Sequence, residues 1–170
     1  MSDVVSVGVA ELKVSEGSGI LASYGLGSCV AVAMYDPLRK VGGLAHVMLP
    51  ESRGTAHEET PGKFANTAVS QLVEELMRIG ARRTGLRCKI VGGSQMFDIP
   101  GNNQRSAGSL SGTQTHIGAR NVEGVKRELE KLRIPLVGED TGGNYGRSVR
   151  FDTSTGDVEV KSIYQGIASI

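Results

Sequence analysis

Residues 29–49 read CVAVAMYDPLRKVGGLAHVML, and this stretch decides the fold. Residues 29–35 are apolar without interruption, which is typical of a strand that is buried on both faces. Residues 36–40 contain an Asp-Pro pair and two basic residues, a pattern that predicts a turn. A second apolar run, residues 41–49, stops at Pro50. The two runs therefore predict an antiparallel hairpin.

Two amphipathic helices are expected on the C-terminal side of this hairpin. Thr60 is a candidate N-cap with Pro61 at the first helical position, and apolar residues at helical spacing continue to Met77. Asn121 is the candidate cap of a second helix, which ends before Pro135. Further strands are expected at residues 87–91, 136–138, 147–152 and 158–163. The order of strands, helix, strand, helix and strands favours an α+β fold over a doubly wound sheet.

The composition is that of one globular domain. The chain has 170 residues, of which 39% are hydrophobic and 22% are charged. The formal net charge of +1 and the absence of Trp argue against a nucleic-acid partner. No apolar stretch approaches the roughly 18 residues of a membrane span, and the N-terminus has no signal-peptide pattern. We expect a cytoplasmic protein with reduced thiols and no membrane insertion.

Cys29 and His46 are the residues that point to chemistry. Cys29 lies where a glycine-rich loop enters the first apolar run, and His46 interrupts the second run. A hairpin centred so that position 29 faces position 46 would place their Cβ atoms roughly 5 Å apart, whereas a slip of one residue would separate them onto opposite faces. A thiol beside an imidazole is a nucleophile with its base. The other interpretation of Cys29 is a small core residue.

The remaining parts of such a site lie close by in the sequence. Ser23, just before the glycine-rich loop, is a candidate to orient the histidine ring. The backbone N–H groups of the loop, at Gly27, Ser28 and Cys29, are candidates for an oxyanion hole.

Other polar features carry less chemistry. Cys88 is expected to be a core residue, and neither His57 nor His116 has an evident catalytic role. A zinc site formed by Cys29, His46 and one of these three residues lacks the paired ligand spacing of zinc motifs, so no metal or cofactor is expected. Residues 139–144 predict either a turn at the wall of a cleft or a backbone nest for an anion. Residues 98–115, rich in Gly, Ser, Asn and Gln, predict a long surface loop.

Six blocks in order resemble one family, the chemoreceptor glutamine deamidase CheD. They are GLGSCV at residues 25–30, HVMLP at 46–50, the helical stretch 63–76, KIVGG at 89–93, IGARN at 117–121 and EDTGG at 139–143. The resemblance covers residues 7–163. It is consistent with one domain over residues 1–163, followed by a tail at residues 164–170.

The resemblance implies a three-layer α/β/β sandwich and a Cys-His-Thr triad. Cys29 and His46 fall on the nucleophile and base positions, and Ser23 stands where the family usually has Thr. The resemblance also implies deamidation of glutamines on methyl-accepting chemotaxis receptors through a cysteine thioester, with hydrolysis of receptor methyl esters as a further activity. The implied partner is the phosphatase CheC. Two alternatives are a non-catalytic adaptor that binds CheC and a metal-dependent hydrolase.

Overall fold

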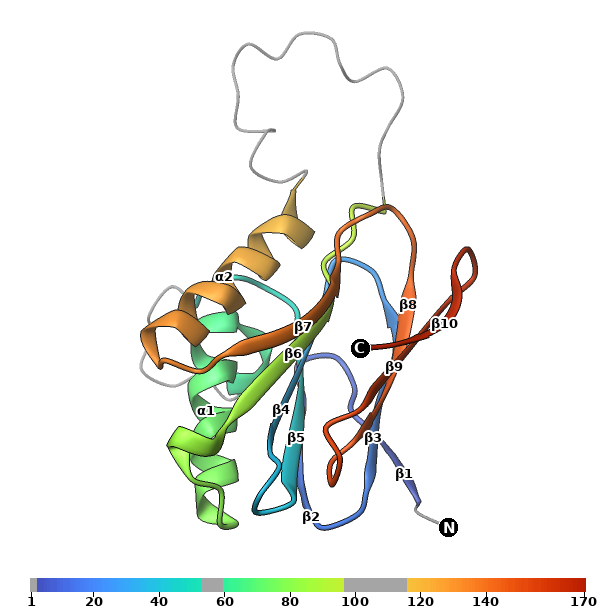
Figure 1. The fold of residues 1–170 in the computed structure, drawn as a ribbon. Helices are drawn as coiled ribbons and strands as arrows, with labels where there is room; N and C mark the ends of the chain where they lie inside the picture. The colour runs from blue at the N-terminus through green and yellow to red at the C-terminus, as the bar shows by residue number, and fades with distance from the viewer. Residues whose placement is uncertain (1–2, 53–59, 97–115) are drawn as a thin grey trace, which may run out of the picture.

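The structure is a computed structural model that describes residues 3–52, 60–96 and 116–170. Two five-stranded sheets lie face to face, and two helices cover the far side of one of them (Figure 1). The predicted α+β sandwich of α/β/β layers is thus confirmed. None of the helices in the described ranges is both long and apolar enough to cross a membrane.

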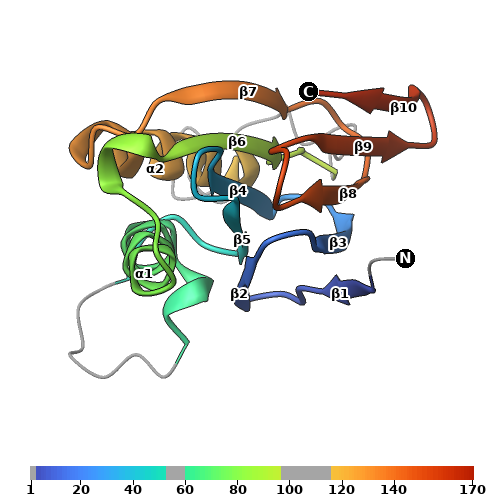
Figure 2. The same cartoon turned by 60° about the horizontal axis from the view of Figure 1, so that its bottom comes forward.

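The central sheet lies between the helices and the other sheet. Its strand order is β2-β5-β4-β6-β7, formed by Leu12–Glu16, Val41–Val47, Val30–Asp36, Arg87–Gly92 and Leu136–Thr141. The outer sheet has the order β1-β3-β8-β9-β10, formed by Val4–Ser6, Ile20–Leu26, Arg147–Asp152, Val158–Ser162 and Gly166–Ser169. Helices α1 (Ala65–Arg78) and α2 (Ile117–Lys131) pack on the central sheet, on the side away from the outer sheet (Figure 2).

Strand β4 is buried on both faces, as its unbroken apolar run predicts. Val30, Val32 and Met34 belong to the core between the central sheet and the helices. The alternate residues Ala31, Ala33 and Tyr35 belong to the second core, between the two sheets. Because side chains alternate along a strand, one apolar run supplies both cores.

The predicted hairpin of residues 29–49 is confirmed, but its register differs from the one considered. Ala31, and not Cys29, is the cross-strand partner of His46. The turn sets this register: the Asp36 carboxylate accepts hydrogen bonds from the N–H groups of Leu38 (3.1 Å) and Arg39 (3.2 Å) and closes a four-residue loop. The offset is two residues, so Cys29 and His46 stay on the same face.

Both helices begin elsewhere than the sequence suggests. Thr60 precedes a short 3₁₀ turn, Pro61–Lys63, and α1 starts at Ala65. Phe64 separates the two because it bridges to Leu49 in an extended conformation. Helix α2 starts at Ile117, so Asn121 lies inside it and is not its cap.

Two further stretches bear on the predicted organisation. Residues 164–170, treated above as a tail, include β10, which pairs antiparallel with β9. The predicted surface loop at residues 98–115 lies outside the described residues.

Replacing Phe151 tests the core between the sheets. Its ring is fully buried and lies 6.1 Å from the ring of Tyr35. We expect Phe151→Ala to lower the free energy of unfolding by about 3–5 kcal/mol, because it leaves a cavity. Urea denaturation measures this, with the exposed Val137→Ala as a control expected to change it by less than about 0.5 kcal/mol. Equal effects of the two substitutions would contradict a packed core between the sheets.

Candidate functional site

Cys29 and His46 lie at the same end of the sandwich, on the face of the central sheet that packs against the outer sheet. Cys29 lies one residue before β4, is partly buried and packs against the core between the sheets. His46 is buried near the end of β5 and shares the face of Leu44, a member of the same core. Diagonal neighbours in an antiparallel pair are roughly 7–8 Å apart, a distance that a histidine ring can span.

A main-chain carbonyl orients the His46 ring. Nδ1 of His46 lies 3.2 Å from the carbonyl oxygen of Val7. A carbonyl can only accept, so Nδ1 carries the proton and Nε2 presents its lone pair. This Nε2 is buried and has no hydrogen-bond partner within residues 3–52, 60–96 and 116–170. The ring is therefore held in the tautomer that can accept a proton.

Ser23 contacts the same carbonyl and not the ring. Its hydroxyl, fully buried on β3, donates to the Val7 oxygen at 2.8 Å. The expected orienting group thus lies next to His46 but acts on the carbonyl that holds the ring. A main-chain oxygen has no signature in a sequence, which is why Val7 was missed.

Main-chain hydrogen bonds join the segment after Val7 to β5 at His46. The N–H of Ala10 donates to the His46 carbonyl at 3.0 Å, and the N–H of His46 donates to the Glu11 carbonyl at 2.9 Å. The Glu11 carboxylate in turn accepts from the N–H of Gly8 at 2.8 Å. These bonds position the Val7 carbonyl against the ring.

Burial disfavours the charged forms of both candidate groups. It raises the pKa of the Cys29 thiol above its ordinary value. It also lowers the pKa of His46, against the opposing effects of the Val7 carbonyl and of the Glu11 charge. Both shifts favour a neutral thiol and imidazole over a thiolate–imidazolium pair.

The glycine-rich loop is held through its carbonyl groups. The N–H of Ser94 donates to the Gly27 carbonyl at 2.8 Å, and the amide of Asn121 donates to the Ser28 carbonyl at 2.9 Å. Sequence reasoning took Asn121 for a cap. Its position three residues after Gly118 and four before the buried Val125 is the signal that it lies on the inward face of α2.

Gly92 and Gly93 let β6 approach Cys29 closely. The N–H of Gly93 donates to the Cys29 carbonyl at 2.8 Å. Gly92 has a φ of +115°, and a Cβ there would lie 2.3 Å from that carbonyl oxygen. Only glycine fits this position, for steric and conformational reasons together.

Residues 139–144 form the end of β7 and a turn, as one of the two interpretations predicts. Buried Arg147 holds this turn, because its Nε donates to the Asp140 carboxylate at 3.0 Å and its Nη1 donates to the Gly142 carbonyl at 2.7 Å. The same Nη1 donates to the hydroxyl of Ser94 at 2.9 Å. Arg147 thus links the turn to the residue that holds Gly27.

The other candidates of the sequence lie apart from this pair. Cys88 is fully buried in the core between the central sheet and the helices, as predicted. His116 precedes α2 and lies 3.0 Å from the side-chain oxygen of Gln95. His57 lies outside the described residues.

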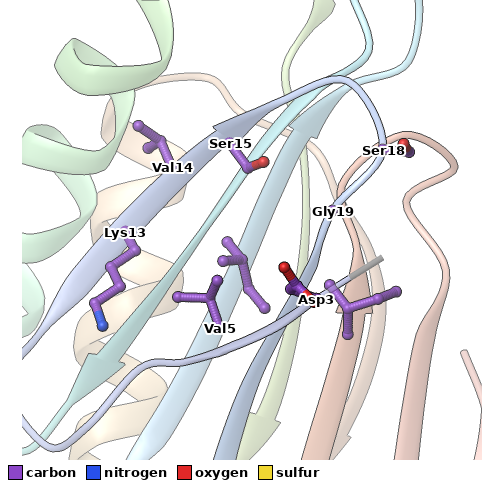
Figure 3. Close-up of a pocket in the computed structure, with 9 residues that line it drawn as sticks. Asp3, Val5, Lys13, Val14, Ser15, Ser18 and Gly19 are labelled. Carbon is purple, nitrogen blue, oxygen red and sulfur yellow. The ribbon is translucent and has the colours of Figure 1, made fainter. Parts of the chain in front are cut away.

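Two of the hollows among the described residues bear on the candidate site. A groove of about 630 Å³ runs past the glycine-rich loop and is lined in part by Gly25, Met96, Lys161 and Tyr164. A second pocket, of about 420 Å³, lies between the β1–β3 edge and β2 and is shown in Figure 3. Ser23, Cys29 and His46 do not line this second pocket.

Replacing Ser23 tests which group orients the ring. We expect Ser23→Ala to lower the free energy of unfolding by about 1 kcal/mol, through loss of one buried hydrogen bond, and to leave the Nδ1–H tautomer of His46 in place. Nitrogen NMR of the imidazole reads the tautomer, and urea denaturation reads the stability. Ser148→Ala, at a half-buried serine on β8, is the control for stability. A switch to the Nε2–H tautomer would contradict orientation by the Val7 carbonyl.

Known proteins are similar to this one over nearly the whole chain. The family model for CheD, described as CheD chemotactic sensory transduction, matches residues 48–162. "Chemoreceptor glutamine deamidase CheD" of Thermotoga maritima is 46% identical over 160 residues, covering 94% of this chain and 92% of that protein. The protein of the same name from Halalkalibacterium halodurans is 42% identical over 167 residues, covering 98% of each.

A further relative comes from another bacterium. "Probable chemoreceptor glutamine deamidase CheD" of Desulfitobacterium hafniense (strain DSM 10664 / DCB-2) is 45% identical over 166 residues, covering 98% of each chain. With the family model matching more than half of the sequence and relatives of this similarity spanning nearly all of it, the chain belongs to the CheD family.

Proposed function

We propose that this protein is a protein-glutamine deamidase that converts glutamine side chains of chemotaxis receptors to glutamate. One observation carries the proposal. In a chain whose relatives are named chemoreceptor glutamine deamidases, the proton-accepting Nε2 of His46 is buried, without a partner in the described residues, on the same face as the thiol of Cys29. That arrangement suits a nucleophile and its base.

The reaction begins with the transfer of a proton. Nε2 of His46 takes the thiol proton as Sγ of Cys29 attacks the side-chain amide carbon of the glutamine. The carbonyl π bond opens, and its electron pair stays on the oxygen as an oxyanion. We assign the stabilisation of this charge to backbone N–H groups of the glycine-rich loop, including that of Cys29.

The intermediate then collapses and is hydrolysed. The carbonyl re-forms as the C–N bond breaks, and the His46 imidazolium gives its proton to the leaving group, so that ammonia departs and a thioester remains. His46 next accepts a proton from water, whose oxygen attacks the thioester, and the proton returns to the departing Cys29 sulfur. Glutamine and water thus give glutamate and ammonium.

Ser23 and Val7 act on His46 in this scheme. The Val7 carbonyl holds Nδ1–H at 3.2 Å, which keeps Nε2 free to accept a proton and supports the imidazolium when it forms. Ser23 keeps that carbonyl in place through its 2.8 Å hydrogen bond. Ser23 is accordingly a positioning residue, one step removed from the reacting atoms.

The product explains how the reaction could affect signalling. Each turnover adds one negative charge to a receptor segment, and a change of charge can shift a bistable helical assembly. A cytoplasmic location, hydrolysis of receptor methyl esters through the same thioester, and regulation by a CheC-type phosphatase are parts of the same proposal. The groove beside Gly25 offers aromatic and apolar surface, with Lys161, to the segment that carries the glutamine.

Mass spectrometry of a receptor cytoplasmic fragment is the direct test. We expect the wild-type protein to add about 1 Da at defined glutamines, the change from an amide to an acid. Cys29→Ala and His46→Ala should each reduce the rate by at least about 10⁴-fold, because residues that act as one unit fail together. Cys88→Ala, at the other free cysteine, is the control and should keep its activity if it folds.

Two results would overturn the proposal. One is a wild-type protein that leaves every glutamine unchanged while it binds a CheC-type phosphatase, which would indicate an adaptor. The other is a Cys29→Ala protein that deamidates at the wild-type rate.

The neutral thiol and imidazole predict a specific pH dependence. Only neutral His46 can accept the proton, and burial lowers its pKa, so kcat/KM should rise with pH and reach half of its maximum below about pH 6.5. Because burial raises the pKa of the Cys29 thiol, its alkylation by iodoacetamide should still be accelerating above about pH 8.5. Peptide mapping assigns the alkylation to Cys29. A flat alkylation rate between about pH 5 and 8 that is lost in His46→Ala would indicate a preformed ion pair instead.

A further inference from the structure

We infer that Asn121 is a positioning residue for the reaction. Its amide group holds the carbonyl of Ser28 and thereby aims the backbone N–H of Cys29 at the oxyanion. The inference rests on the proposed function, since it concerns the intermediate formed on Cys29.

Asn121 contacts the nucleophile loop directly from helix α2. Its Nδ2 donates to the carbonyl of Ser28 at 2.9 Å and to the carbonyl of Met48 at 3.0 Å. The side chain is completely buried. Both partners are acceptors, so the two amide hydrogens are used and the orientation of the amide is determined.

The geometry of the peptide bond carries this contact to Cys29. In a planar trans peptide, the C=O of Ser28 and the N–H of Cys29 point in opposite directions. Helix α2 lies on one side of the central sheet, and the Cys29 side chain packs on the other side, against the core between the sheets. A Ser28 carbonyl drawn toward α2 therefore turns the Cys29 N–H toward its own sulfur. That N–H donates to no group in the part of the chain that the structure describes.

The second hydrogen bond fixes the loop relative to the base. Met48 follows β5 by one residue, and continuing the β4–β5 register places it opposite Cys29. One amide group therefore ties the residue before the nucleophile to the strand that carries His46. Loop and strand are held at a constant separation on the side away from the substrate.

Two glycines bring α2 close enough for this contact. A Cβ on Gly118 would lie 2.6 Å from the carbonyl oxygen of Gly93, and a Cβ on Gly124 would lie 3.2 Å from that of Pro50. Asn121 lies midway between these glycines, where the helix packs against the segments that follow β5 and β6. A short side chain can then reach two backbone carbonyls at once.

A cost in stability accompanies the contact. The Oδ1 atom of Asn121 is buried and has no hydrogen-bond partner among the described residues. Leaving a buried acceptor unpaired costs about 1–3 kcal/mol, which offsets part of the stability that the two donated hydrogen bonds contribute.

Asn121→Ser and Asn121→Asp test the inference, because each removes at least one of the two donors. We expect kcat for deamidation to fall by about 10- to 10³-fold. The upper value is the effect of losing one oxyanion donor completely, and a misdirected donor should cost less. KM and the alkylation rate of Cys29 by iodoacetamide should stay within about threefold of wild type, since neither needs the oxyanion site. The use of two variants keeps the test valid if one of them does not fold.

An aldehyde inhibitor gives an independent readout. The inhibitor is a receptor peptide with glutamate γ-semialdehyde in place of the target glutamine. Sγ of Cys29 attacks the aldehyde carbon, and the oxygen of the resulting thiohemiacetal occupies the oxyanion site. The affinity for this peptide should fall by the same factor as kcat in both variants. Asn66→Ala is the matched control, because Asn66 bonds the Ser52 N–H from helix α1 at 3.0 Å and should alter stability only.

The outcomes separate the two proposals. If the wild-type protein deamidates and the Asn121 variants keep kcat and aldehyde affinity, the positioning role is wrong and the proposed function stands. If alkylation and KM change as much as kcat, Asn121 only supports the fold and the inference fails. A wild-type protein without deamidase activity overturns the proposed function itself.

Discussion

The burial of strand β4 on both faces is the constraint from which the rest of the structure follows. Its alternate side chains enter two different cores, one against the helices and one against the outer sheet. A slip of one residue would exchange these two sets, and valines and Met34 would replace alanines in the core between the sheets. Such exchanges cost several kcal/mol in close-packed interiors, so the position of β4 is firmly determined.

The candidate pair of Cys29 and His46 owes its geometry to that strand. Cys29 immediately precedes β4, so its side chain must join Ala31 and Ala33 on the side of the outer sheet. His46 lies opposite Ala31 and faces the same way. A thiol and an imidazole thus share one face because two cores must be filled, without any direct bond between them in the resting protein.

Main-chain groups then complete the site. The Val7 carbonyl sets the tautomer of His46, and the carbonyls of Gly27 and Ser28 are held by donors from other elements. These donors are the N–H of Ser94 and the side chain of Asn121. Because backbone groups have directions fixed by planar peptides, holding the carbonyls also directs the N–H groups that follow them. In this view the fold prepares the charge-stabilising groups before substrate arrives, which avoids reorganisation during the reaction.

The layer order was implied by the resemblance to the CheD family, whereas the residues themselves predicted the hairpin and the double burial of β4 and singled out Cys29 and His46 as candidates. Each of the latter predictions depends on local periodicity or on residue type, which a sequence states directly. Only the tertiary structure decided the register, the partner of Ser23 and the place of Asn121. The carboxylate of Asp36 closes the turn and shifts the register by two residues, and Phe64 delays the first helix by bridging to Leu49. The Val7 carbonyl and the contact of Asn121 join segments far apart in the chain, and such main-chain and long-range bonds depend on packing that no local pattern encodes.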